Sequence, residues 1–178
     1  RIYGMENMEE MDRIFRKRVH RPDYVAEYQR VYDANKVLFK GQPAVPFTFK
    51  DITGKEVSLS DLKGKYVYID VWATWCGPCN AEIPHLKKLE EEFEGRNICF
   101  VSISCDDSQK AWERFVQAKQ LGGIQLHMGG DKSFMEAIRC KGIPRFMLID
   151  QDGKFLNANM PRPSDGKTLE ILNALPGL

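Results

Sequence analysis

Residues 75–79 read Trp75-Cys76-Gly77-Pro78-Cys79, which places two thiols two residues apart. Such a pair can close into a disulfide and reopen, so this spacing indicates redox chemistry. The residues before it, 65–72, are rich in β-branched and aromatic side chains and predict a buried strand. Residues 81–93, directly after it, predict a helix. A C-x-x-C pair between a strand and a helix is the context expected for a redox motif.

The position of each motif residue at the start of this helix predicts its role. Free N–H groups and the helix dipole favour a thiolate at Cys76, and the thiolate is the nucleophilic form. Pro78 suits the first helical turn, where its missing N–H is not needed. Gly77 allows a partner chain to approach closely. Cys79 lies almost one turn into the helix, so we expect it to be shielded and to act as the resolving thiol.

A zinc site is the alternative use of Cys76 and Cys79. It requires a second ligand pair at similar spacing. The other cysteines, Cys99, Cys105 and Cys140, are scattered, and the three histidines lie apart from one another. The sequence therefore predicts no metal site, and no cofactor beyond the two thiols.

Further features lie at set distances from the motif. Asp70 precedes Cys76 by six residues, and Pro84 follows Cys79 by five. Gly142-Ile143-Pro144 comes before the apolar run at 146–149. With these features the chain resembles the thioredoxin superfamily over roughly residues 44–175. The resemblance implies a thioredoxin-like α/β fold, in which a mixed central sheet is flanked by helices.

The same resemblance implies roles for three of these residues. Asp70 corresponds to a buried acid, Pro84 to a proline that kinks the active-site helix, and Pro144 to a cis-proline. The cis bond would present the backbone of Ile143 to an extended substrate, which would pair with it as an added strand. Trp75 would offer the substrate an apolar surface beside Gly77 and Pro78.

The finer pattern is similar to the TlpA-like branch, the extracytoplasmic thiol-disulfide oxidoreductases of bacteria. It rests on six stretches: 47–51, 54–55, 58–65, 72–76, 82–84 and 148–154. The resemblance implies protein disulfide or dithiol substrates, an upstream thiol electron donor, and a periplasmic location, with a membrane anchor possible in the full-length protein. It also implies an active-site acid at Glu82. The Gly-Pro pair between the cysteines favours a reductant.

Asp70 and Glu82 are the candidates to take the proton of Cys79. A buried carboxyl has a raised pKa and can act as a base near neutrality. Glu82 follows Cys79 by three residues, so the two can share one face of the helix. Alternative interpretations are a purely structural acid at Asp70 and a solvated helix residue at Glu82.

Bulk properties set limits on partners and on organisation. The 178 residues fit one domain with an appendage, and the net charge of +1 gives no electrostatic case for binding nucleic acid or an anionic membrane. No apolar run approaches the ~18 residues needed to span a bilayer. The chain begins at Arg1, which we take as the start of a mature or trimmed product.

We divide the chain into residues 1–43, a two-helix extension and linker, and residues 44–178, the thioredoxin-like domain. Apolar residues at helical spacing predict helices over 5–20 and 23–39. We expect these helices to form a lid packed on the domain core, because amphipathic stripes usually bury in their own fold. A surface for docking a partner, or the tail of an upstream domain, is the alternative.

The domain itself reads as alternating strands and helices, which argues for a parallel sheet core. The predicted strands are 47–50, 55–58, 65–72, 97–104, 125–128, 145–150 and 154–159. The predicted helices are 77–94, 108–120, 133–140 and 166–175.

Three positions keep open interpretations. Cys99 reads as a core residue, whereas Cys105 and Cys140 are either free thiols, which we favour, or a second disulfide. Arg145 departs from the small residue usual after the cis-proline. Its cation would stabilise the thiolate, select acidic substrates or point to solvent.

Two other functions compete with thiol-disulfide exchange. The first is a thiol peroxidase, which needs a Pro/Thr/Arg cradle before its cysteine instead of the context around Cys76. The second is a redox-inactive binding module that docks a partner through residues 1–40. The presence of all four residues Cys76, Cys79, Asp70 and Pro144 argues against a loss of redox activity.

Overall fold

A seven-stranded mixed sheet forms the centre of the computed structural model, which describes residues 8–178. The strand order is β2-β1-β5-β4-β3-β6-β7. β3, β4 and β5 are parallel, whereas β1 and β6 join them antiparallel. This is the mixed α/β sheet expected from the sequence. The strands are β1 (Thr48–Asp51), β2 (Glu56–Ser58), β3 (Tyr66–Trp72), β4 (Ile98–Ser104), β5 (Ile124–His127), β6 (Arg145–Ile149) and β7 (Phe155–Asn157).

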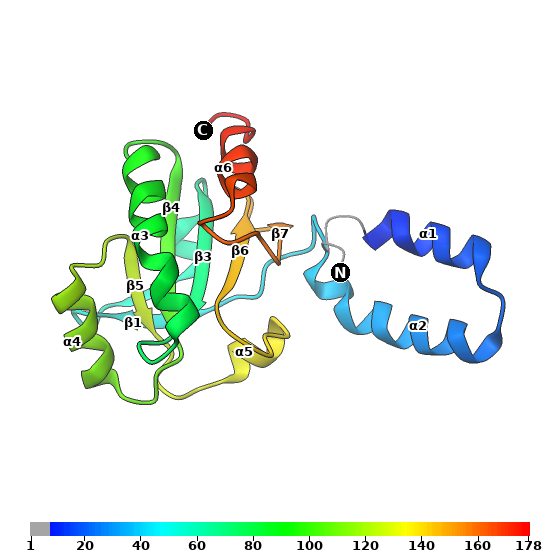
Figure 1. Ribbon diagram of the computed structural model, residues 1–178, viewed down its shortest axis with the longest axis horizontal. Coiled ribbons are helices and arrows are strands. Elements are labelled where there is room, and N and C mark those ends of the chain that lie inside the picture. Colours follow the sequence, from blue (N-terminus) through cyan, green and yellow to red (C-terminus); the bar gives the residue numbers. More distant parts are fainter. Residues whose placement is uncertain (1–7) are drawn as a thin grey trace.

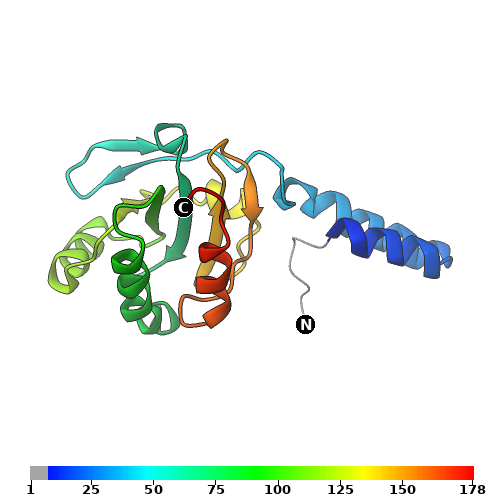
Figure 2. The same cartoon turned by 90° about the horizontal axis from the view of Figure 1, so that it is seen from above.

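Helices cover one face of the sheet (Figures 1 and 2). α3 (Gly77–Glu92) and α6 (Gly166–Asn173) share a buried cluster with the sheet, in which Leu89 and Leu172 meet Tyr68. α4 (Gln109–Lys119) brings Trp112 and Val116 against Trp72 and the two motif cysteines. The active-site end of α3 therefore contacts both the sheet and α4.

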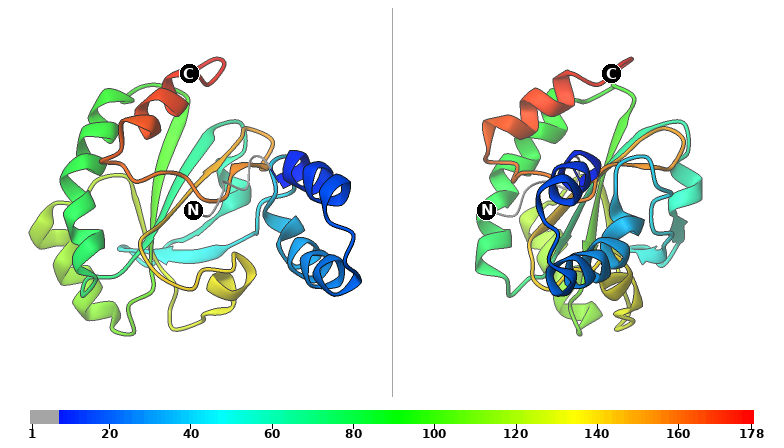
Figure 3. Two further views of the ribbon diagram at one scale, coloured as in Figure 1. Left: turned by 45° about the vertical axis from the view of Figure 1, so that its right-hand side comes forward. Right: turned by 90° about the vertical axis from the view of Figure 1, so that its right-hand side faces the viewer.

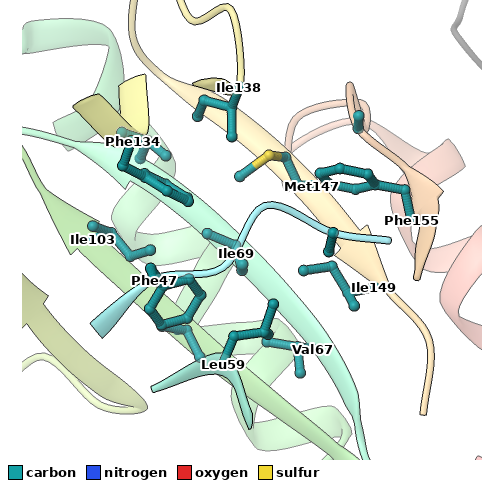
Figure 4. Packing of buried hydrophobic residues seen from close by; sticks show 14 of the residues in the cluster. Phe47, Leu59, Val67, Ile69, Ile103, Phe134, Ile138, Met147, Ile149 and Phe155 are labelled. Atoms are coloured by element: carbon teal, nitrogen blue, oxygen red, sulfur yellow. The ribbon is translucent and has the colours of Figure 1, made fainter. Parts of the chain in front are cut away.

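The other face carries the larger core, which Figure 4 shows from close by. Phe47 and Leu59 come from the chain before β3, and Phe134 comes from α5 (Ser133–Ala137). They pack on Val67 and Ile69 of β3, together with β4, β6 and Phe155. Leu59 belongs to a 3-10 turn, Leu59–Leu62, that the sequence did not predict although Ser58 and Asp61 form a capping box at its start.

β3 is buried along its whole length, and its alternation sorts its side chains between the two faces. Val67, Ile69 and Val71 belong to the larger core. Tyr68 and Trp72 belong to the clusters beneath α3 and α4. Asp70 lies between those two in sequence, so it faces α3 and the motif.

The N-terminal helices form a hairpin that stands clear of the sheet beyond β7 (Figures 1 and 3). Neither α1 (Met8–Arg18) nor α2 (Pro22–Asn35) contains a buried residue. Their apolar stripes meet each other instead, and the rings of Phe15 and Tyr28 stack at 3.8 Å between centroids. The prediction of a lid packed on the core was wrong: neither helix buries a residue, and Ile14, Tyr24 and Val31 stay exposed. The first residues of the helix predicted over 5–20 lie outside the described part of the chain.

Residues 36–44 belong to the body of the molecule. Leu38 is fully buried and Phe39 nearly so, immediately after α2 ends at Asn35 instead of the predicted residue 39. Backbone hydrogen bonds join Gly41 to Phe155 at 2.7 Å and Ala44 to Gly153 at 2.9 Å. The stretch read as a linker thus runs along β7 and pairs with it.

Candidate active site

The two motif cysteines form a disulfide at the start of α3, with 5.2 Å between their Cα atoms. Cys76 is the N-cap residue, and its Sγ accepts a hydrogen bond from the backbone N–H of Cys79 at 3.2 Å. Once the disulfide is reduced, this N–H and the helix dipole are placed to favour a thiolate at Cys76. The helix start thus supplies what a nucleophilic thiol needs.

Both sulfur-bearing residues are shielded in the disulfide state. Cys79 is 4 % exposed, as its place in the helix predicts, and Cys76 is only 5 % exposed. Gly77 and Pro78 between them are exposed. Trp75 is 70 % exposed and offers an apolar surface next to the disulfide. The exposed surface of the motif is therefore formed by Trp75, Gly77 and Pro78.

The loop before β6 lies against this site. The Ile143–Pro144 peptide bond is cis, which confirms the expectation from the sequence. Ile143 packs against the cluster that contains both motif cysteines. Among the turn and loop hydrogen bonds of the described residues, none uses the backbone amide or carbonyl of Ile143. These two groups are free to pair with an added strand.

A small cavity of about 20 Å³ connects the groups predicted to act on Cys79. Cys79, Asp70, Glu82 and Pro144 all line it. A cavity of this size holds about one water molecule. The two acids and the buried cysteine thus border one space that is large enough for a single water.

Asp70 is a buried acid with a single neutral partner. It is 4 % exposed, and its Oδ1 accepts a hydrogen bond from the hydroxyl of Ser102 at 2.6 Å. Burial raises the pKa of Asp70 to about 7, although the Ser102 hydrogen bond opposes the shift and the charge of Glu90 adds to it. Asp70 can thus take or release a proton near neutral pH.

Glu82 is also buried, at 4 % exposed, so it is not a solvated helix residue. Its two oxygens accept hydrogen bonds from the N–H and the hydroxyl of Ser164, both at 2.9 Å. Arg162 lies 3.7 Å away and forms an ion pair with it. The carboxylate that the sequence predicted as an active-site acid thus anchors the loop before α6 to α3.

Of the three interpretations left open for Arg145, a side chain that simply points to solvent is wrong. It is half-buried on the face of β6 opposite Phe146, and it donates to the carbonyl of Ile138 at 3.1 Å and to Asn159 at 3.4 Å. Burial lowers its pKa. The guanidinium therefore binds the carbonyl at the end of α5.

Cys99, Cys105 and Cys140 are free thiols, the interpretation favoured for the latter two. Cys105 and Cys140 line a hollow of about 390 Å³ together with Trp75 and Ile143. Burial raises the pKa of all three thiols, so each is less nucleophilic than an exposed cysteine. Within residues 8–178 no group of three His, Cys, Asp or Glu side chains is placed to hold a metal.

A sequence model of the AhpC/TSA family matches residues 40–157, which include the disulfide, both acids and the cis-proline loop. The chain belongs to the AhpC/TSA family. Its curated relatives include the thiol-disulfide oxidoreductase ResA of Bacillus subtilis, 28% identical over 151 residues that cover 84% of each protein.

Solved structures agree with this placement in the AhpC/TSA family. The solution structure of a Bacteroides vulgatus protein described as a thiol-disulfide oxidoreductase is 61% identical, with a TM-score of 0.68, and covers 75% of this chain and 88% of its own. The thioredoxin domain of another B. vulgatus thiol-disulfide oxidoreductase is 28% identical, with a TM-score of 0.70, and covers 76% of this chain and 96% of its own. This AhpC/TSA member is a thiol-disulfide oxidoreductase of the thioredoxin-like type.

Sequence reasoning missed three residues of this AhpC/TSA site. Arg162 and Ser164 hold Glu82 from a loop some 80 residues further along the chain, and no local pattern marks them. Asp106 is 3 % exposed and receives hydrogen bonds from Thr74, two residues before Cys76. A signal for Asp106 was present, because an acid two residues after a buried strand lies at the carboxyl edge of the sheet, where sites form.

Proposed function

We propose that this oxidoreductase reduces disulfides in protein substrates, with Cys76 as the attacking thiol and Cys79 as the resolving thiol. The main support is the placement of the disulfide at the start of α3. There the Cys79 N–H points at the Cys76 sulfur, and Cys79 faces a cavity shared with a buried acid. No comparable arrangement surrounds the three free thiols.

The reaction runs in two exchange steps. The Cys76 thiolate attacks one sulfur of the substrate disulfide, and the other substrate sulfur leaves as a thiolate that takes a proton from solvent. Cys79 then loses its proton and attacks the Cys76 sulfur. The substrate leaves with two thiols, and the two electrons it gained come from the Cys76 and Cys79 thiols, which are oxidised to the disulfide. An upstream dithiol donor of the same chemical class restores the reduced enzyme.

We assign the proton of Cys79 to Asp70. Both residues line the small cavity, and a carboxyl with a pKa of about 7 is matched to proton transfer at neutral pH. Glu82 lines the same cavity, but its oxygens are occupied by Ser164 and Arg162. Its share in catalysis is therefore to close the cavity over Cys79 and to hold negative charge there.

Substrate recognition follows from the exposed surface around the disulfide. Trp75, Gly77 and Pro78 present an apolar loop, and the free amide and carbonyl of Ile143 suit an extended segment. The hollow lined by Trp75 and Ile143 has room for an apolar side chain beside the substrate cysteine.

The reducing direction and the location rest on the TlpA-like resemblance. The Gly-Pro pair between the cysteines favours a reductant, and the branch is extracytoplasmic. The described helices include none that is long and apolar enough to cross a bilayer. We accordingly propose a periplasmic reductase that receives electrons from a separate thiol donor.

The equilibrium reduction potential of Cys76–Cys79 tests this proposal. Redox buffers would set the potential of the solution. Tryptophan fluorescence and mass would report the fraction of the protein that carries the Cys76–Cys79 disulfide. We expect a two-electron transition near or below about −230 mV. A potential of about −120 to −180 mV would instead make the protein an oxidant or isomerase.

Two single variants complete the test. Cys76→Ser is expected to abolish reduction of a protein disulfide, whereas Cys79→Ser is expected to accumulate the mixed disulfide. Cys99→Ser, which alters a free thiol outside the site, is the matched control and should behave as wild type. Peroxide consumption that depends on Cys76 would support a thiol peroxidase, and no redox transition at all would favour a binding module.

A further inference from the structure

Asp106 is a buried carboxylate that receives an unusual set of donors. It follows β4 by two residues and is 3 % exposed. The backbone N–H of Thr74 lies 3.0 Å from one carboxylate oxygen and 3.2 Å from the other, and the Thr74 hydroxyl donates at 2.7 Å. The hydroxyl of Ser104 donates to the same carboxylate at 2.7 Å. Hydrogen bonds to a charged acceptor are the strong ones, and they offset the cost of burying the charge.

The segment that Asp106 holds leads directly into the disulfide. Thr74 precedes Cys76 by two residues, and the carbonyl of Thr74 accepts a hydrogen bond from the side chain of Asn80 at 3.0 Å. Asn80 follows Cys79 by one residue. Asp106, Thr74 and Asn80 therefore form a chain of hydrogen bonds that fixes the backbone just before one cysteine to the helix just after the other.

Asp106 is itself held from the opposite side. Its carbonyl accepts a hydrogen bond from Nε2 of His127 at 2.8 Å, and Nδ1 of His127 accepts from the N–H of Gly129 at 3.1 Å. The ring of Trp112 lies 5.2 Å from the imidazole. All three of Asp106, His127 and Trp112 are buried. The anchor is thus built into the core beneath α4 and is not a surface contact.

We infer that Asp106 is a positioning residue for the redox reaction, which acts through Thr74 to keep Cys76 within reach of Cys79. Fixing the loop means that less conformational freedom is lost when the disulfide closes. The anchor therefore favours the disulfide over the dithiol, and makes the reduced protein a stronger reductant. This inference rests on the proposed function of Cys76 and Cys79.

The test is a redox titration of the full chain against glutathione, in wild type and in variants of the anchor. Asp106→Asn is expected to shift the equilibrium constant about tenfold toward the dithiol, which corresponds to a potential about 30 mV less negative. Thr74→Val removes only the hydroxyl donor, and we expect about a threefold shift in the same direction. Thr74→Ser keeps both donors and should restore the wild-type value.

Ser108→Ala is the matched control for stability. The Ser108 hydroxyl caps α4 two residues after Asp106 without touching Thr74. It should lower the melting temperature and leave the potential unchanged. Potentials equal to wild type in both Asp106→Asn and Thr74→Val would overturn the inference. A shift in Asp106→Asn alone would also overturn it, because the carboxylate would then act by its charge and not by holding Thr74.

The proposed function and the role of Asp106 can be disproved separately. A wild-type protein without a two-electron transition would defeat the proposed function itself. If wild type shows a normal transition and the anchor variants have the same potential, only the role of Asp106 is contradicted. If Asp106→Asn does not fold, the Thr74→Val and Thr74→Ser pair still decides the matter, because Thr74 is half-buried and its replacement leaves the carboxylate in place.

Discussion

Asp70 combines full burial with one neutral donor, and this combination gives it a pKa near neutrality. An ionised carboxylate in such a place is costly, because burial in a medium of low dielectric penalises the charged form. Ser102 returns only part of the lost hydration, through one hydrogen bond of 2.6 Å. The raised pKa suits Asp70 to proton transfer but lowers the stability of the folded protein at neutral pH. The rate of the second exchange step and the pH dependence of unfolding measure these two effects.

The catalytic consequence concerns the second exchange step. Asp70→Asn keeps the size of the side chain and removes the base, so resolution of the mixed disulfide should slow about 100-fold. The first attack by Cys76 should change little, because it needs no proton from Cys79. Rapid mixing with a labelled disulfide peptide, followed by acid quench, separates the two steps. Equal slowing of both would refute the assignment of Asp70 to Cys79.

The stability consequence has a definite sign. The pKa of Asp70 is about 7 in the folded chain and about 3.9 when unfolded. The folded state therefore binds the proton more tightly. This contribution is fully present below about pH 4 and is lost as the pH rises through 7. The free energy of unfolding of Asp70→Asn, taken relative to that of wild type, should therefore rise by about 2 kcal/mol from pH 5 to pH 8.

Denaturant unfolding at the two pH values measures this difference, with Asp107→Asn as control. Asp107 is an exposed acid on the loop after β4, so its replacement controls for the exchange of an acid for an amide. A constant difference between Asp70→Asn and wild type across this range would contradict a raised pKa at Asp70.

At the scale of elements, α3 is anchored at two points near its start, about one turn apart. The disulfide holds its first turn, and Glu82 binds Ser164 and Arg162 at the loop before α6. Glu82→Ala would leave the Ser164 donors without their acceptor and widen the cavity beside Cys79. We expect a loss of about 1–3 kcal/mol in the free energy of unfolding.

Hydrogen exchange gives that prediction its local signature. Amides of residues 162–168 should exchange faster in Glu82→Ala, while those of β3 and β4 keep their protection. Glu91→Gln alters an exposed acid on the same helix and serves as control. If the 162–168 loop keeps its protection in Glu82→Ala, Glu82 is not its anchor.

Local sequence patterns predicted elements well where partners are near in sequence. The apolar run before Cys76 predicted β3, and the spacing of Asp70 placed its side chain beneath the motif. The same reasoning did not find the hydrogen-bond partners of Glu82 and Thr74, which lie 82 and 32 residues away. The two helices within 8–35 were predicted, but their packing was not, because an amphipathic stripe does not say which apolar surface it meets. Phe15 found Tyr28 instead of the core.

At the scale of the whole molecule, the chain consists of a two-helix hairpin and a body that begins earlier than the sequence predicted. The proposed boundary at residues 43 and 44 cuts through a stretch that pairs with β7. Gly41 and Ala44 bond to Phe155 and Gly153, and Leu38 and Phe39 are buried. We therefore propose that the folded body of the molecule starts near residue 36.

Two truncations test this boundary. The chain 36–178 removes both helices but keeps Leu38, Phe39 and the bonds to β7, so its melting temperature and reduction potential should stay close to those of the full chain. The chain 44–178 also loses the two buried side chains, each worth roughly 1.5–3 kcal/mol of burial. It should unfold at a clearly lower denaturant concentration. Equal stability of the two truncations would return the boundary to residue 43, and a large loss already in 36–178 would mean that the hairpin is part of the folded body.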